Sequence, residues 1–179
     1  MRTIITLTIV LACASLAAQT NYYTKTRTFV MEGYTYQCDV DASRMVTLYN
    51  QDNQWPNTGP VYTSTGKVYA PDDGEWIPLL EDDTWTRQKR HDIVNNAFSA
   101  SERQRLKGRR FSITMYINPQ TGRVEEVDFT FHVTNPHATI PVAIYRQIET
   151  KLKEQVWYTP TAEGRKLNFI LLSWRQEPE

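Results

Sequence analysis

The feature that most constrains the fold of this chain is the alternation of apolar and polar side chains in its last third. A period of two is typical of a half-buried β-strand. Segments 111–117 and 127–133 both have it, with apolar side chains at Phe111, Ile113, Met115, Ile117, Val127, Phe129, Phe131 and Val133. The intervening Asn118–Gly122 contains the Pro and Gly of a tight turn, and a phase break at Glu125-Glu126 indicates a β-bulge. The pattern predicts an antiparallel hairpin with one buried face.

A helix and a final strand are predicted after this hairpin. Helical spacing connects the apolar residues Val142, Tyr145, Ile148, Leu152 and Val156, and Pro141 suits the start of that helix. Segment 167–174 has apolar side chains at both odd-numbered and even-numbered positions, which predicts a strand covered on both faces. The handedness of crossovers favours placing it beside 111–117. Strand 111–117 would then be central, and 167–174 would be an edge strand.

The preceding residues predict more strands and two helices. Segments 24–30, 34–40 and 44–49 are rich in Thr, Tyr and Val, and 61–70 suits a short hairpin. Helical spacing over 86–97 is followed by a capping box at Ser99 and Glu102 and a second helix ending at Gly108. The fold class is therefore α+β, built on an antiparallel sheet. Residues 19–179 form a single domain: strand-rich 24–80, helical 84–108, and the hairpin–helix–strand unit 111–174.

Residues 1–18 have the composition of a cleavable signal peptide. Arg2 precedes an apolar run from Thr3 to Leu16, and Ser15-Leu16-Ala17 provides the small residues that signal peptidase requires. The run is shorter than a membrane span. We therefore expect export to the periplasm or outer membrane, or beyond the cell, and no transmembrane span in the mature chain. The alternative is a lipoprotein, because Val10–Cys13 loosely resembles a lipobox with Cys13 as the lipidated residue.

Charge and motifs exclude several classes of function. The 20 basic and 20 acidic residues cancel, so no net field favours nucleic acid. Residues 50–85 carry seven acidic side chains against Lys67, whereas residues 86–123 carry nine basic against two acidic. These segments either neutralise each other or leave a basic patch for an anionic partner. The sequence has no nucleotide-binding, zinc-protease or hydrolase motif, and neither catalytic residues, a cofactor nor a metal is predicted. Cys38, in phase with Tyr34, Tyr36 and Val40, is expected to be a buried core thiol.

Residues 111–174 resemble the TonB C-terminal domain superfamily. The resemblance rests on the run Tyr116–Val124, on the helix, on Trp157-Tyr158-Thr159-Pro160, and on Gly164 before the last strand. The mature chain also resembles uncharacterised secreted proteins of Bacteroides-like bacteria, which share Leu106-Lys107-Gly108 and the Ile117–Gly122 run. The resemblance implies a protein of the cell envelope that grips a peptide by β-augmentation. Unlike energy-transducing members, this chain has no Pro-rich spacer or retained anchor.

These observations favour a non-catalytic secreted or envelope protein that binds a protein or peptide partner. The expected binding edge is the last strand, either open to a partner or covered by the strands of 24–49. Its candidate residues are Leu167, Asn168, Phe169, Ile170, Leu171 and Leu172. Two alternatives remain: an enzyme acting on glycan or cell wall, and a structural or adhesive secreted protein.

Overall fold

The computed structural model describes residues 20–70, 77–82 and 84–179. The predicted signal peptide, Cys13 and the predicted turn at 71–74 lie outside them. The strands are β1 Arg27–Met31, β2 Tyr34–Val40, β3 Met45–Asn50, β4 Phe111–Ile117, β5 Val124–His132 and β6 Ile170–Gln176. The helices are α1 Thr84–Asn95, α2 Ala100–Leu106 and α3 Val142–Gln155, with short 3-10 turns at Pro136–Thr139 and Gly164–Lys166.

The six strands form one antiparallel sheet in the order β1-β2-β3-β5-β4-β6. The predicted hairpin is present as β4 and β5, and its register shifts between Tyr116 and Ile117, opposite the predicted bulge. As expected, β6 pairs with β4, so β4 is an inner strand and β6 an edge strand. These findings confirm an α+β fold with a hairpin–helix–strand unit at its C-terminal end.

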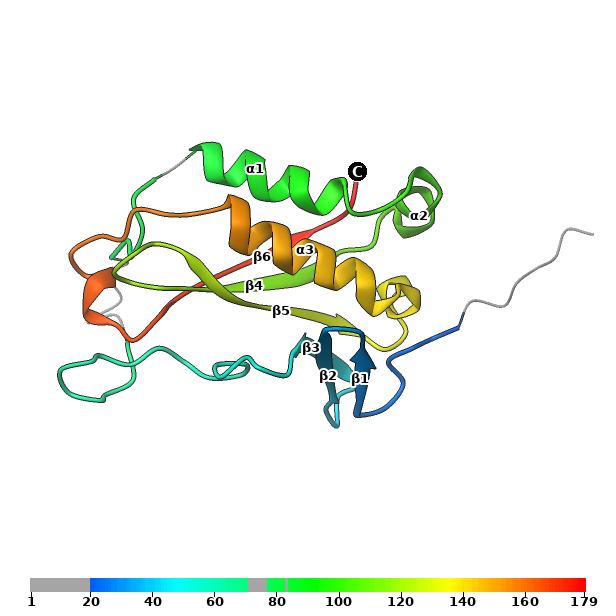
Figure 1. Ribbon diagram of the computed structural model, residues 1–179, viewed down its shortest axis with the longest axis horizontal. Helices are drawn as coiled ribbons and strands as arrows, with labels where there is room; N and C mark the ends of the chain where they lie inside the picture. Colours follow the sequence, from blue (N-terminus) through cyan, green and yellow to red (C-terminus); the bar gives the residue numbers. More distant parts are fainter. Residues whose placement is uncertain (1–19, 71–76, 83) are drawn as a thin grey trace, which may run out of the picture.

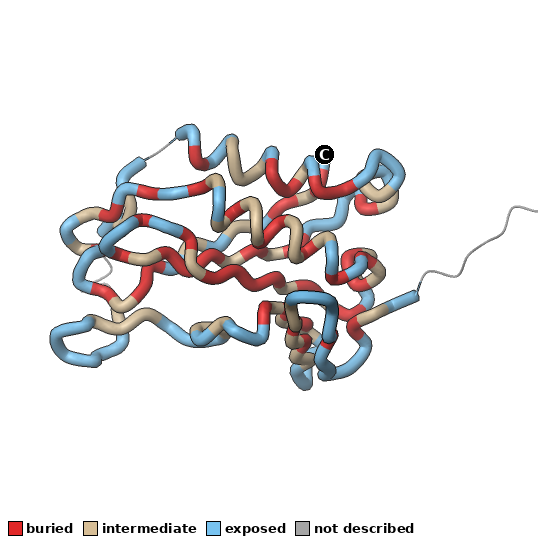
Figure 2. The backbone as a smooth tube through the Cα atoms, viewed as in Figure 1, coloured by how far each residue is buried: buried red, intermediate tan, exposed pale blue. Residues whose placement is uncertain are grey.

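The helices lie on one face of the sheet (Figure 1). Helix α3 packs across β5, with Tyr145, Ile148 and Leu152 fully buried against the sheet. Helix α1 packs beside α3, and α2 follows it after the capping box that Ser99 and Glu102 form as predicted. Buried residues are concentrated along β4 and β5 and on the inner sides of the helices (Figure 2). In the described residues, no helix has both the length and the apolar character that crossing a membrane requires.

The N-terminal strands extend the sheet at β5, which contradicts the alternative that they cover the last strand. Strand β3 pairs with β5 from Met45 opposite His132 to Tyr49 opposite Asp128. This register places Val46 and Leu48 in the same buried cluster as Phe129 and therefore extends the core. At the opposite edge of the sheet, α1 and residues 77–82 lie along β6.

The last strand starts three residues later than predicted, because another segment binds its expected beginning. The Asn168 amide donates to Val61 O at 3.0 Å, and the Val61 amide donates to the Asn168 side chain at 2.8 Å. From Ile170 onward, burial alternates. Leu171, Ser173 and Arg175 are exposed, so the prediction that both faces of this strand are covered was wrong.

The sheet face opposite the helices is covered at one end by the loop after β3, which runs beneath the sheet (Figure 1). Trp55 of this loop stacks on Phe169 with ring centroids 4.9 Å apart and lies 6.2 Å from Tyr116. The buried Glu126 carboxylate accepts hydrogen bonds from the amides of Gln54 and Trp55, at 2.8 and 3.0 Å. These contacts hold the loop against β4 and β5 and leave β6 at the rim.

Candidate functional site

The outer edge of β6 is unpaired among the described residues, because no backbone hydrogen bond in them joins this edge to another segment. The Val133 amide, at the end of β5, donates to Arg44 O at 3.0 Å. The backbone groups of Val133 and of every second residue before it therefore point toward β3. Backbone groups of an antiparallel strand point alternately to its two neighbours. When this alternation is followed from β5 through β4 to β6, the backbone groups of Leu171, Ser173 and Arg175 point away from β4. Each of the three presents an amide and a carbonyl to the edge.

A groove of about 1000 Å³ runs along this edge. One wall is β6 from Ile170 to Arg175, and the other is formed by residues 77–82 and α1. The two walls meet at each end of the groove. At one end an added Cβ on Gly164 would contact both Leu79 O and Ile170 Cδ1, whereas at the other the Gln176 side chain donates to His91 O at 3.0 Å. The groove therefore follows the whole length of the strand.

The two ends of the groove differ in chemistry. The end near Ile170 is apolar and acidic, and its lining includes Ile77, Leu79, Leu80, Glu81 and Asp82. The end near Gln176 is basic, with Arg87, Arg90, His91 and Arg175. In the described residues, none of these three arginines takes part in an ion pair. Within the described residues, the carboxylates nearest this end, Asp92 and Glu179, thus form no ion pair with these arginines.

Arg90 is the most constrained of these basic side chains. Its guanidinium lies 4.9 Å from the centroid of the Trp174 ring, and Nη1 donates to the Tyr158 hydroxyl at 3.3 Å. Its Nε is buried and has no hydrogen-bond partner in the described part of the chain. The position of the group is thus set by α1 and β6 together, while one of its donors stays unsatisfied.

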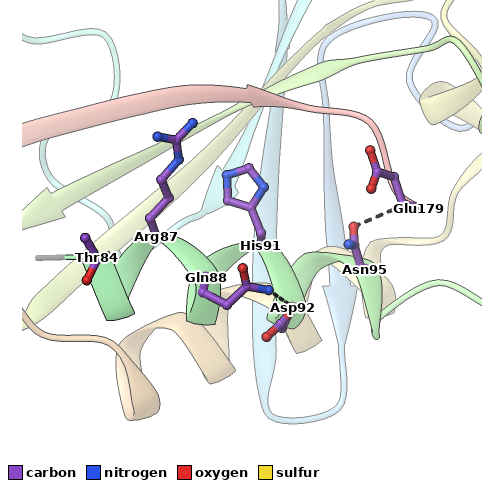
Figure 3. A pocket seen from close by; sticks show the side chains of 7 residues that line it. All are labelled: Thr84, Arg87, Gln88, His91, Asp92, Asn95 and Glu179. Atoms are coloured by element: carbon purple, nitrogen blue, oxygen red, sulfur yellow. Dashed lines mark hydrogen bonds between the residues drawn. The ribbon is translucent and has the colours of Figure 1, made fainter.

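A second, smaller pocket of about 320 Å³ adjoins the basic end and shares Arg87 and His91 with the groove. Both side chains point away from the α1 axis to the same side (Figure 3). Burial lowers the pKa of His91, and the nearby Arg90 and Arg87 lower it further. The carboxylates of Glu179 and Asp92 act on the pKa of His91 in the opposite direction. The other residues lining this pocket are Thr84, Gln88, Asp92, Asn95 and Glu179.

The six predicted edge residues divide into two groups. Leu167 and Asn168 are bound to the 61–63 segment, and Phe169 packs under Trp55. Ile170, Leu171 and Leu172 lie on β6 and line the groove. Of these, only Leu171 has its backbone amide and carbonyl pointing away from β4.

Sequence reasoning missed Ser173 and Arg175, although their alternation with Leu172 and Trp174 was visible. It also missed the α1 wall. Arg87 and Arg90 are three residues apart, which places them on one face of a helix, but no local pattern shows that this face meets β6.

The other candidates from the sequence lie away from the groove. Cys38 is buried in β2, where burial and the neighbouring Asp39 charge raise the pKa of its thiol to about 11. His137 is buried beneath α3, and His132 is bonded to Thr134. Among the residues that the structure describes, no three His, Cys, Asp or Glu side chains form a group that could hold a metal ion. No ion pair in that part of the chain joins 50–85 to 86–123.

Comparisons with known proteins identify relatives but no activity. A family model described as "Domain of unknown function (DUF5043)" matches residues 19–174. A crystal structure of a DUF5043 family protein from Bacteroides uniformis is 43% identical in sequence, with a TM-score of 0.84 over 89% of each chain. No curated protein matches.

Proposed function

Because the chain belongs to the DUF5043 family, whose description names no function, we propose a function from its own geometry. The protein is a non-catalytic binding protein that takes an extended segment of a protein partner as an additional strand on β6. The observation that carries this proposal is the outer edge of β6, which is unpaired among the described residues and lies along a groove of about 1000 Å³. A strand added there would have backbone partners on one side and the α1 wall on the other.

Backbone pairing supplies affinity at such an edge, and side-chain contacts supply specificity. Leu171, Ser173 and Arg175 offer outward amides and carbonyls, and each hydrogen bond contributes a net of about 0.5–1.5 kcal/mol. The exposed Ile77 and Leu171 add apolar surface that water solvates poorly. This mode agrees with the resemblance of 111–174 to the TonB C-terminal unit, which we retain as part of the proposal.

We also propose that the protein acts in the cell envelope after export. The support is the Arg2, Thr3–Leu16 and Ser15-x-Ala17 pattern of the sequence. The intact mass of the protein from an envelope fraction should correspond to cleavage near Ala17 to Gln19. A retained Met1 would contradict export by this route, and a lipid on Cys13 would replace it with the lipoprotein route.

Amide hydrogen exchange on the free protein tests the open edge. We expect fast exchange at Leu171, Ser173 and Arg175, and slow exchange at Leu172 and Trp174, because the latter two donate to β4. Uniform protection along β6 would show that the edge is already paired and would overturn the proposal.

A proline at Ser173 tests binding itself, since it removes an outward amide without touching the β4 ladder. We expect Ser173→Pro to weaken capture of a strand-forming peptide while Ser173→Ala leaves it unchanged. Circular dichroism of both variants checks that the fold is retained. Equal binding by the two variants would place the partner elsewhere.

A further inference from the structure

The groove beside β6 has a charge pattern that selects its occupant. Its basic end combines Arg87, Arg90 and Arg175, and in the described residues none of them is paired with a carboxylate. Its other end carries Glu81 and Asp82 beside Leu79 and Leu80. A strand lying in this groove would meet positive charge at one end and apolar and negative groups at the other.

The basic end is built to meet an acceptor. Arg90 is held by Trp174 and by the Tyr158 hydroxyl, yet its buried Nε lacks a partner in the described part of the chain. A buried donor without a partner is unfavourable, so an acceptor that reaches this guanidinium is favoured. A carboxylate suits a guanidinium best, because it accepts from two of its N–H groups in one plane.

We infer that the segment bound along β6 is an acidic one: an extended peptide whose side chains alternate between the two faces of the sheet. Its carboxylates face Arg87 and Arg90 on the α1 face and Arg175 on the opposite face, and its apolar side chains face Leu79 and Leu172. This inference rests on the proposed strand addition and names the chemistry of the partner. A lipid or a free anion would satisfy the arginines but would leave the outward amides and carbonyls of β6 without partners. A peptide satisfies both.

The test uses a phage-displayed library of random 12-residue peptides, selected on the immobilised mature protein at low ionic strength. We expect the selected peptides to be enriched in Asp and Glu and to protect the amides of Leu171 and Ser173 from exchange. Their affinity should fall as salt is added, because the charges at the mouth of the groove are exposed to screening.

The matched variants separate this inference from the proposed function. Arg87 and Arg175 are exposed, so the double variant Arg87→Glu/Arg175→Glu reverses the charge of the groove without disturbing the core. Arg109→Glu/Arg110→Glu makes the same change at exposed positions that do not line the groove. We expect the first variant to weaken the selected peptides by on the order of tenfold and the second to leave them unchanged.

Each other outcome is decisive. Peptides that protect β6 but show no acidic enrichment, or that tolerate the groove variant, would overturn the acidic partner and leave strand addition standing. Acidic peptides that bind without protecting β6 would overturn both, because the arginines would then bind anions apart from the edge. If no selected peptide protects β6, strand addition and this inference fail together.

Discussion

His137 is a fully buried imidazole among aromatic rings. It stacks on Phe111 with centroids 4.4 Å apart, and Phe98 and Phe131 lie within 6.5 Å. Nδ1 lies 2.8 Å from Asn135 Oδ1, which requires the proton on Nδ1, whereas Nε2 has no partner in the described residues. Burial, with a smaller contribution from Arg105, lowers the pKa of this imidazole to about 3. The site holds a neutral histidine.

This histidine makes stability depend on pH. The unfolded chain binds its proton near pH 6.5, whereas the folded chain does so only near pH 3. Stability from this group is therefore complete above the unfolded pKa and is lost as the pH falls towards the folded pKa. We expect a loss of about 2 kcal/mol between about pH 7 and about pH 5.

Urea unfolding of the wild type and of His137→Phe at both pH values measures this loss. The difference between the two proteins isolates His137 from His91 and from the carboxylates. A difference that is independent of pH would show that His137 does not titrate in this way.

Some residue-level features could be predicted because their cause is local. The capping box needs only Ser99 and Glu102 three residues apart. Cys38 is buried because its side chain lies on the same face of β2 as that of Tyr36. The role of Arg90 could not be predicted, because it depends on Trp174, which lies 84 residues further along the chain and is brought alongside by the sheet.

At the scale of elements, Gly122 shows why the hairpin turn has its sequence. Its φ is +71°, which favours glycine, and its carbonyl accepts from the Tyr158 amide at 2.9 Å. An added Cβ would lie 1.8 Å from Tyr158 O. The turn between β4 and β5 is therefore also the docking point of the segment that follows α3.

Gly108 provides a matched control for this turn. Its φ is +74°, but an added Cβ would meet nothing within 4 Å. We expect Gly108→Ala to lower the free energy of unfolding by about 1–2 kcal/mol, and Gly122→Ala to lower it by a further ~1–3 kcal/mol from overpacking. Urea denaturation of both variants measures these values. Equal losses would mean that the 157–158 segment moves away without cost.

Most elements could be predicted from their periodicity, whereas their pairing depended on long-range contacts. The hairpin and α3 have clear periods of two and 3.6 residues. The start of β6 was predicted at Leu167 because apolar residues continue there, but Asn168 binds Val61 across the molecule. Tertiary packing likewise determined that the N-terminal strands pair with β5 and not with β6.

At the scale of the whole molecule, one buried cluster connects every layer. It includes Phe29 of β1, Leu48 of β3, Ile113 of β4, Leu152 of α3 and Ile170 of β6. A buried hydrogen bond also crosses the layers, from the Tyr36 hydroxyl to Glu149 of α3, and Arg146 and Lys153 flank that carboxylate. The N-terminal strands are thus part of the same core as the C-terminal unit.

This shared core predicts a single cooperative unfolding transition. We expect the urea curves followed by tryptophan fluorescence and by far-ultraviolet circular dichroism to coincide. Two separated transitions would show that residues 20–70 form an independently stable unit.

The position of β6 in the chain sets the order in which the molecule can be completed. Strands β1 to β5 lie within residues 27–132 and can assemble among themselves, but β4 acquires its second neighbour only from residues 170–176. One side of β4 therefore stays vacant until residues 170–176 have joined the sheet. During that interval β4 is the rim of the sheet, and a foreign strand that reached it first would occupy the place of β6.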